Sequence, residues 1–344
     1  MLGDIVGAIF EGKPNKNLIL VSGRSYPQLA DNVASQLGIE VLKTTAYDFA
    51  NGEMYVRYTE SVRGADVFVL QSHAGDVNKA IMEQLIMIDA LKRASARSIS
   101  AVCPLLGYSR QDKKHLGREP ISCRLVFDLL RSAGADRVMS VDLHAAQTQG
   151  FFDGPVDHLI AMPVLVDYIR DRFQGEFSNV AVVSPDAGRI RVAEQWAQRL
   201  GGGPLAFVHK TRDITTPNHA VANRVVGDVE GKDCVLVDDL IDTGGTIAGA
   251  CEVLKKAGAK SVTIVATHGV LSDPAVERLK NCGAREVVLT DTVPIDESKR
   301  WDGLTVLSIA PLLASAIKAV FEDGSVAELF DNYPVHHGQG FLFA

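Results

Sequence analysis

Two adjacent aspartates and a turn of small residues follow an apolar run in the segment VLVDDLIDTGGT, residues 235–246. Val235–Val237 predict a buried parallel strand, so both aspartates fall at its carboxyl end, where open α/β sheets place their ligands. Carboxylates there can accept hydrogen bonds from ribose hydroxyls. The turn is predicted to lead into a helix near Ile247, and its small side chains let backbone amides surround a phosphate. These features predict a ribose phosphate site made of Asp238, Asp239, Asp242, Thr243, Gly244, Gly245 and Thr246.

An ordinary strand-to-helix turn is the alternative explanation for this segment, because Asp, Thr and Gly are common turn residues. The doubled aspartate before the glycines favours a binding site over a turn alone. The segment is not a Walker A loop, since the pattern GxxxxGK[ST] occurs nowhere in the chain.

Composition limits the class of protein. The chain has 344 residues, of which 47% are hydrophobic, so it is long enough for two domains with their own cores. Its 35 basic and 42 acidic residues give a net charge of −7, which disfavours nucleic acid as a partner. An acidic protein that handles phosphates is expected to need a divalent metal ion.

Five cysteines are scattered through apolar segments without a CxxC pair, which indicates reduced core residues. The first residues lack the basic segment and cleavage site of a secretory signal, and no run of about 18 apolar residues follows. We therefore expect a cytoplasmic protein with no membrane attachment.

A weak internal repeat is the main indication of fold. The segments 91–102, 130–141, 254–265 and 279–290 each combine a helix end, a small-residue turn and a β-branched strand. Their recurrence in both halves of the chain predicts an α/β fold with two similar domains, each a mostly parallel sheet flanked by helices. Further elements are predicted as strands at 18–22, 66–71 and 180–184 and as helices at 78–93 and 121–133.

Domain boundaries follow from the same pattern. We expect an N-terminal domain over 18–160 and a C-terminal domain, which contains the ribose phosphate turn, over 161–330. Residues 331–344 lack any periodicity and are predicted to form a tail.

Several separate motifs carry a family resemblance that covers residues 18–330. They are FANGE at 49–53, YSRQDKKHLGREPIS at 108–122, SVDLHAAQTQGFFDGPVDH at 140–158, SPDAG at 184–188, KTR at 210–212 and VDDLIDTGGT at 237–246. Together they resemble the ribose-phosphate pyrophosphokinase family, class I, of bacterial type. The last motif is shared with type I phosphoribosyltransferases, whereas RQDKK and DLHA favour the kinase-like enzyme. The resemblance implies two phosphoribosyltransferase-like domains.

The reaction that this resemblance implies is a magnesium-dependent transfer of the diphosphoryl group of ATP to the anomeric hydroxyl of ribose 5-phosphate. Its products are 5-phosphoribosyl 1-diphosphate and AMP. Two alternatives remain open at this point. A salvage phosphoribosyltransferase would have no ATP site, and a catalytically silent regulatory subunit of the same family would be expected to lose metal or loop residues.

The resemblance also places the nucleotide site. Phe49 offers an aromatic face and Arg110 a planar cation, a pair suited to stacking on adenine. Family members place the Phe49 loop at a subunit boundary and are commonly homo-hexamers activated by inorganic phosphate, so we expect the same of this chain. The remaining expected ATP contacts are Asn51, Gly52, Glu53, Gln111 and Asp112.

Two further positions are implied as magnesium ligands. His144 follows the predicted strand 137–141 and Asp186 follows the predicted strand 180–184, so both can reach one crevice. Magnesium prefers oxygen ligands, so the assignment of His144 rests on the resemblance alone. The carboxylates of Asp142 and Asp186, acting through water, are an alternative.

Catalysis is assigned by resemblance to Lys210 and Arg212, which follow the predicted strand 205–209 and open a polar stretch without periodicity. A mobile loop here would close over ATP, with Arg212 also contacting substrate, and would align the anomeric oxygen with the β-phosphorus. Thr211 replaces the middle charge of the family's segment. Arg189 follows Gly188 where the family usually has a second glycine, and this arginine could restrict the loop or contact a phosphate. Arg63 and Ser325 resemble parts of the family's regulatory site.

Overall fold

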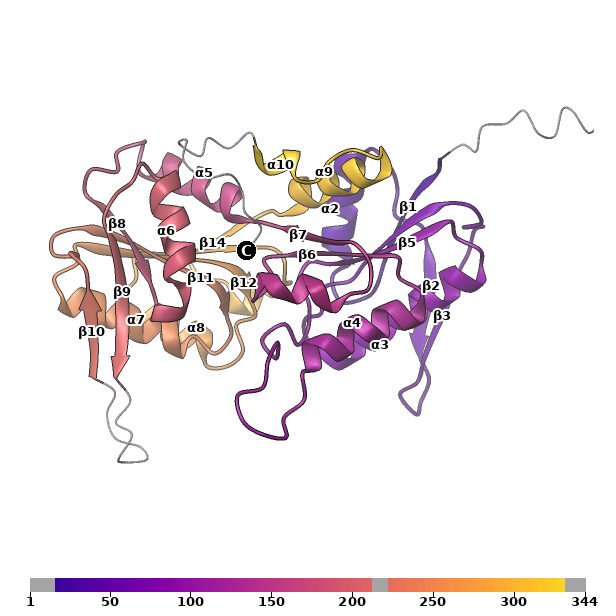
Figure 1. The fold of residues 1–344 in the computed structure, drawn as a ribbon, viewed down its shortest axis with the longest axis horizontal. Helices are drawn as coiled ribbons and strands as arrows, with labels where there is room; N and C mark the ends of the chain where they lie inside the picture. Colours follow the sequence, from indigo (N-terminus) through magenta and orange to yellow (C-terminus); the bar gives the residue numbers. More distant parts are fainter. Residues whose placement is uncertain (1–15, 212–221, 332–344) are drawn as a thin grey trace, which may run out of the picture.

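The computed structural model describes residues 16–211 and 222–331 of the chain. The first half of the chain forms a five-stranded sheet, seen on the right of Figure 1. All neighbouring strands in it are parallel. The strands are mostly buried because helices cover both faces of the sheet. In spatial order they are β1 (Leu18–Ser22), β4 (Asp66–Leu70), β5 (Ser98–Cys103), β6 (Arg137–Val141) and β7 (Val156–Leu159).

The second half forms a seven-stranded sheet, in which only the pair β10 and β9 is antiparallel. The predicted α/β class, with two mostly parallel sheets flanked by helices, is therefore confirmed. The spatial order is β10 (Ala222–Val226), β9 (Leu205–Thr211), β8 (Val180–Ser184), β11 (Asp233–Ile241), β12 (Ser261–Gly269), β13 (Glu286–Thr290) and β14 (Leu304–Leu307).

Helices cover the sheets as three groups. One group packs on the same face of both sheets and contributes to a core cluster that runs through both halves. The other two groups each cover the opposite face of one sheet. The shared group consists of α2 (Pro27–Leu37), α5 (Met162–Arg172), α6 (Ile190–Arg199), α9 (Ala310–Phe321) and α10 (Glu328–Asp331). The opposite face of the first sheet is covered by α3 (Val77–Arg93) and α4 (Ser122–Ala133). The opposite face of the second sheet is covered by α7 (Gly245–Lys256) and α8 (Ala275–Asn281). The described residues also form three short 3-10 turns, η1 (Ala146–Phe151), η2 (Ala187–Arg189) and η3 (Glu297–Lys299).

A two-stranded antiparallel hairpin of β2 (Thr44–Asp48) and β3 (Met54–Tyr58) extends from the first sheet. Sequence periodicity did not predict it, because its residues are mostly half-exposed and lack a regular apolar face. Its tip carries the FANGE motif at 49–53.

The four repeated segments have the predicted structure. Each covers the end of a helix and the strand after it, which are α3 and β5, α4 and β6, α7 and β12, and α8 and β13. The predicted strands at 18–22 and 180–184 have the observed bounds.

Three predicted boundaries at the site need correction. β11 continues past Val237 because β12 pairs with it as far as Ile241, so Asp238 and Asp239 lie inside the strand. α7 begins at Gly245, two residues before Ile247, because Gly244 provides the left-handed turn that precedes it. β9 runs to Thr211 because β10 pairs with its end, so Lys210 belongs to the strand and residues 222–224 of the predicted loop belong to β10.

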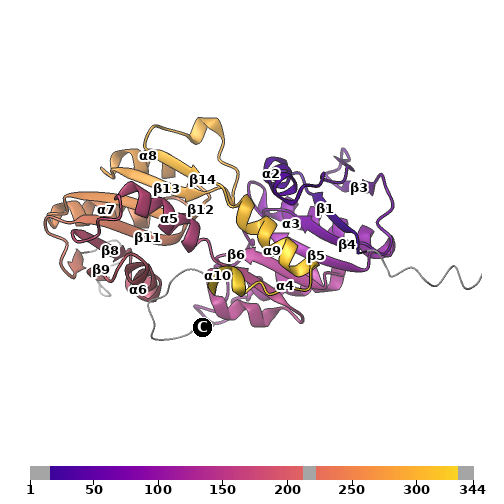
Figure 2. The ribbon, with the colours of Figure 1, turned by 90° about the horizontal axis from the view of Figure 1, so that it is seen from above.

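The division into two domains near residue 160 stays a prediction. The strands of the first sheet end at Leu159 and those of the second begin at Val180. However, α9 crosses back and packs on α2, as Figure 2 shows, so the end of the chain ties the two halves together. The predicted tail lies outside the described residues apart from its first residue.

Polar contacts join the carboxyl ends of the two sheets. The Thr267 hydroxyl donates to a carboxylate oxygen of Asp142 over 2.6 Å. The Nε2 atom of His268 lies 3.1 Å from the Val141 carbonyl oxygen. The Ser72 hydroxyl donates to the Thr292 carbonyl oxygen over 2.6 Å. The ends of β6 and β12 are therefore in direct contact where the two halves meet. Within the described ranges, no helix is long and apolar enough to cross a membrane.

A fully buried histidine, His73, makes folding sensitive to acid. Its Nε2 lies 2.8 Å from the Gln84 side-chain oxygen and its Nδ1 accepts from the Gly107 amide over 3.0 Å, which suits a neutral ring. Burial lowers the pKa of His73 to about 4. Because this lies below the unfolded pKa of about 6.5, its contribution is complete above pH 6.5 and is lost as the pH falls toward 4. We expect protonation of His73 to lower the free energy of unfolding by on the order of 3 kcal/mol at pH 4, measured by urea unfolding.

The matched variants are His73→Gln, which cannot titrate, and His115→Gln, which changes an exposed histidine. The unfolding free energy of His73→Gln should depend less steeply on pH than that of the wild type, whereas His115→Gln should keep the wild-type slope. Equal slopes in all three proteins would contradict the assignment.

Candidate active site

An ionic cluster lies where the two halves meet, and Arg189 is at its centre. The Nη2 atom of Arg189 is 2.6 Å from the Asp239 carboxylate on β11 and 2.6 Å from Nδ1 of His144, which follows β6. The Nη1 atom donates to the His144 carbonyl oxygen over 3.1 Å. His144 Nδ1 is itself 2.7 Å from the Asp239 carboxylate. The cluster thus joins residues of both halves at the carboxyl ends of their strands.

Asp238 and Asp239 have side chains only 13% and 15% exposed, so their charges interact strongly. Burial, followed by repulsion from Asp239, raises the pKa of Asp238 well above its usual value. Burial acts in the same direction on Asp239, but the hydrogen bond to His144 and the charge of Arg189 outweigh it and lower the pKa of Asp239. The first negative charge of the pair is therefore carried by Asp239.

The predicted phosphate turn lies at the N-terminus of α7. Gly244 has φ of 72°, a left-handed conformation that suits glycine, and a Cβ there would come within 3.3 Å of the Ala275 Cα. No side chain caps the helix at Gly244, so its first amides are not used by a capping side chain. Thr243, Gly245 and Thr246 are exposed beside it. Amides at a helix N-terminus favour an anion, as the sequence predicted for this turn.

Arg110 reaches this turn from the other half of the molecule. Its Nη2 atom lies 2.7 Å from the Asp242 carboxylate. A hydrogen bond from Ser272, together with Arg110, lowers the pKa of Asp242. The side-chain oxygen of Gln111 accepts from the Ser122 hydroxyl over 2.8 Å. Arg110 thus contacts the predicted phosphate turn from the first half of the chain.

Phe49 lies elsewhere, at the tip of the β2–β3 hairpin. Its ring is 45% exposed and packs edge-on against Tyr47 and Tyr55. The tip is held by the Asn51 side chain, which accepts from the amide of Glu53, and by Gly52 at φ of 89°. In Figure 1 the hairpin and the loop after β5 are clearly apart. One chain therefore does not bring Phe49 and Arg110 together, and the adenine sandwich stays a prediction.

The two residues predicted to hold magnesium come from neighbouring loops. Asp186 uses one carboxylate oxygen to accept from the Gly188 amide, while His144 contacts Asp239. Across residues 16–211 and 222–331 no group of three or more His, Cys, Asp or Glu side chains could hold a metal ion. Magnesium usually keeps several waters and binds through one or two carboxylates plus substrate phosphates. One histidine and one aspartate are enough for such a site, and the assignment of His144 and Asp186 stays a prediction.

The two residues predicted to be catalytic lie at the limit of what is described. Lys210 belongs to β9, whose C-terminal end approaches the same edge of the sheet as β8 and β11. Arg212 lies outside the described residues.

Two arginines have roles that the sequence did not reveal. Arg189 was noted only as a departure from the family pattern, and its bridge between the halves could not be read from spacing. Arg278 on α8 donates to the Thr243 carbonyl oxygen over 2.9 Å and so holds the phosphate turn. No motif or periodicity marks Arg278, because its partner is 35 residues away in the chain.

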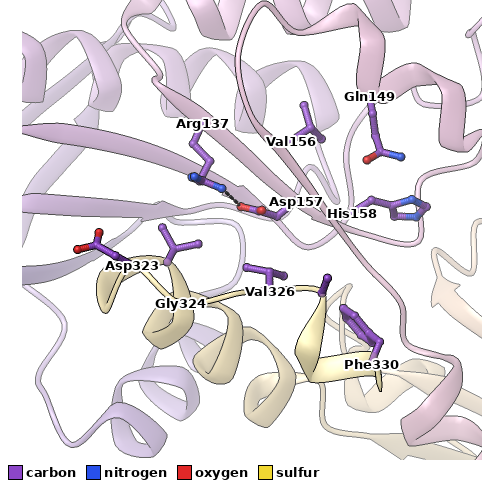
Figure 3. Close-up of a pocket in the computed structure, with 11 residues that line it drawn as sticks. Arg137, Gln149, Val156, Asp157, His158, Asp323, Gly324, Val326 and Phe330 are labelled. Carbon is purple, nitrogen blue, oxygen red and sulfur yellow. Dashed lines mark hydrogen bonds and ion pairs between the residues drawn. The ribbon is translucent and has the colours of Figure 1, made fainter. Parts of the chain in front are cut away.

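A separate pocket of about 420 Å³ lies between β6, β7 and the C-terminal helices (Figure 3). Arg137 and Asp157 form an ion pair of 2.7 Å in its wall. His158 also lines the pocket, and its Nε2 accepts from the Leu143 amide over 2.9 Å, next to His144.

The two residues predicted from the family's regulatory site are not joined in the described chain. Ser325 follows Gly324 at the rim of the pocket, and its hydroxyl accepts from the Glu328 amide over 3.4 Å, as a helix cap does. Arg63 is exposed in the loop before β4.

Two family models match the chain. Residues 18–134 match the N-terminal domain of ribose phosphate pyrophosphokinase. Residues 214–331 match the phosphoribosyl synthetase-associated domain.

Curated relatives and a solved structure agree with these matches. The chain is 88% identical to a ribose-phosphate pyrophosphokinase of Bifidobacterium longum, over 99% of this chain and 100% of the relative. It is 64% identical to the one from Corynebacterium efficiens, over 92% and 97% of the two chains. A crystal structure of phosphoribosylpyrophosphate synthetase from Mycobacterium smegmatis aligns with a TM-score of 0.85 and 62% identity, covering 90% of this chain and all of that one. By sequence and by fold, the chain belongs to the ribose-phosphate pyrophosphokinase family.

Proposed function

We propose that the crevice between the two halves transfers the diphosphoryl group of ATP to ribose 5-phosphate. The anomeric oxygen attacks the β-phosphorus, and the bond from that phosphorus to the oxygen bridging the α- and β-phosphates breaks. AMP leaves, the hydroxyl proton passes to water, and 5-phosphoribosyl 1-diphosphate forms. The family membership supports this reaction.

The observation that carries the proposal is the position of the aspartate pair beside the phosphate turn. Asp238 and Asp239 lie on β11, and the turn of Asp242–Thr246 follows directly at the start of α7. A ribose 5-phosphate with its phosphate on the helix amides would present its hydroxyls to the carboxylates. Its anomeric carbon would then face the crevice between the halves, where the donor nucleotide must enter.

The nucleotide side of the crevice needs positive charge. His144 and Asp186 would hold a magnesium ion there, which would neutralise the triphosphate and orient its β-phosphorus. Arg110, Gln111 and Asp112 lie on the loop after β5 and would contact ATP. For Arg110 this requires release from Asp242, an exchange that a bound nucleotide can drive because the ion pair is half-exposed.

Lys210 and Arg212 would complete the site at the end of β9. Diphosphoryl transfer gives the protein little covalent work, so these cations would act by aligning the reactants and neutralising charge at the β-phosphorus. Closure of the segment over ATP would also exclude water.

The proposed ATP site also depends on the assembly of subunits. The exposed aromatic hairpin tip with Phe49, Asn51, Gly52 and Glu53 is apart from the Arg110 loop of its own chain. It would complete the ATP site of a neighbouring subunit in a homo-hexamer, with inorganic phosphate as activator. The protein would work in the cytoplasm with small-molecule substrates.

A catalytically silent regulatory subunit is the second candidate function. It is weakened because His144, Asp186, Lys210 and Arg212 are all present in the sequence. A salvage phosphoribosyltransferase is weakened because the 88% identity to a pyrophosphokinase covers both halves of the chain.

The first prediction from this proposed function concerns the reaction and the β9 lysine. AMP should form from ATP only when ribose 5-phosphate and magnesium are present, in a coupled assay. Lys210→Ala should lower this rate on the order of 100-fold or more while ATP still binds, because the lysine acts on charge developing at the β-phosphorus.

Lys256→Ala, at the exposed end of α7, is the matched control and should keep the wild-type rate. A folded wild type that binds ATP but releases no AMP would instead identify a silent regulatory subunit.

The second prediction concerns the subunit boundary. Phe49→Ala and Lys210→Ala should each be impaired alone, but mixed oligomers formed by co-expression should regain activity. If each site takes Phe49 from one chain and Lys210 from another, random mixing restores about a quarter of the sites.

Mixing Lys210→Ala with Arg212→Ala is the control and should restore nothing, since both changes disable the same segment. Failure of the Phe49 and Lys210 mixture, in oligomers shown to contain both chains, would place Phe49 in the site of its own chain.

A further inference from the structure

One arginine links the ribose side of the site to its metal side. Arg189 is the last residue of η2 and directly precedes α6, and its side chain is 18% exposed. Its guanidinium contacts the Asp239 carboxylate and both the ring and the carbonyl oxygen of His144. Asp239 belongs to the second sheet and His144 to the loop between β6 and β7 of the first, so the contacts of one side chain join the two halves.

The contacts require the planar fork of an arginine. Nη1 reaches the His144 carbonyl oxygen over 3.1 Å while Nη2 lies 2.6 Å from the Asp239 carboxylate, so two nitrogens serve two partners at once. A lysine ammonium carries the same charge at a single point and cannot span both positions.

Removing the guanidinium would leave Asp238 and Asp239 adjacent without the cation that faces them both. Arg189 Nε is 4.0 Å from the Asp238 carboxylate, so it offsets repulsion between the two acids. His144 would keep only its contact to Asp239 through Nδ1, and its backbone would lose the tie to the second half. Both the ribose-binding carboxylates and the histidine would then be free to shift.

We propose that Arg189 is a positioning residue for the diphosphoryl transfer, because its guanidinium fixes Asp239 and His144 at a set separation across the crevice. This inference rests on the proposed function of the site. As a consequence, the ribose and the β-phosphorus of the donor are aligned for reaction only when the Arg189 guanidinium keeps its contacts to both Asp239 and His144.

The test compares Arg189→Lys and Arg189→Gln with Arg191→Lys, an exposed arginine on the same helix. The kcat of Arg189→Lys should fall about 100-fold, the effect of a misplacement of the order of an ångström. The KM for ATP should change less than about threefold, because the adenine contacts are elsewhere. Arg191→Lys should match the wild type.

A double-variant cycle separates positioning from simple support of the fold. If Arg189 acts through Asp239, adding Arg189→Lys to Asp239→Asn should lower kcat no further than Asp239→Asn alone. Independent, multiplying losses would overturn the proposal, and so would wild-type kcat in Arg189→Lys. Thermal unfolding of each variant identifies a folding defect, and calorimetric binding of ribose 5-phosphate tests Arg189→Gln without turnover.

The calorimetric measurement distinguishes a failure of this inference from a failure of the proposed function. If the wild type forms no AMP, the proposed function fails. Binding of ribose 5-phosphate by wild type and Arg189→Gln still reports on Arg189, since weaker binding in the variant supports the bridge and equal binding overturns it.

Discussion

The arrangement of the molecule depends on polar contacts between the carboxyl ends of its two sheets. Asp142, Thr267 and His268 lie at the ends of β6 and β12 and find their partners in the opposite half. Polar groups in such a place cost free energy unless they are paired, so the two halves are held in one relative orientation. Because the carboxyl ends of strands from both halves meet, loops from both halves can contribute to one site.

The adjacent carboxylates of Asp238 and Asp239 repel each other where the two halves meet. Two adjacent, largely buried carboxylates need a cation, and Arg189 provides it while also contacting His144. The carboxylates predicted to bind ribose and the histidine predicted to bind the metal are consequently coupled by charge. Arg110 makes a similar crossing to Asp242, at the turn predicted to bind a phosphate.

The hairpin of β2 and β3 projects from the first sheet. Its aromatic tip exposes Phe49 to solvent, apart from the loop with which the sequence predicted it would act. An exposed aromatic cluster at the end of a projecting hairpin is suited to contact with another chain. The proposed assembly would therefore have a direct role in catalysis.

Local sequence was enough to predict the α/β class, the four helix-to-strand repeats and the glycine turn before α7, since each depends on periodicity or turn chemistry within a few residues. The extent of β11 could not be predicted, because its end is set by pairing with β12. The bridge from Arg189 to His144 and Asp239 could not be predicted either, because these two partners are 45 and 50 residues away from Arg189 in the chain. The sequence determined which residues could do chemistry, and the tertiary structure decided which of them meet, because distant contacts depend on how the two sheets pack.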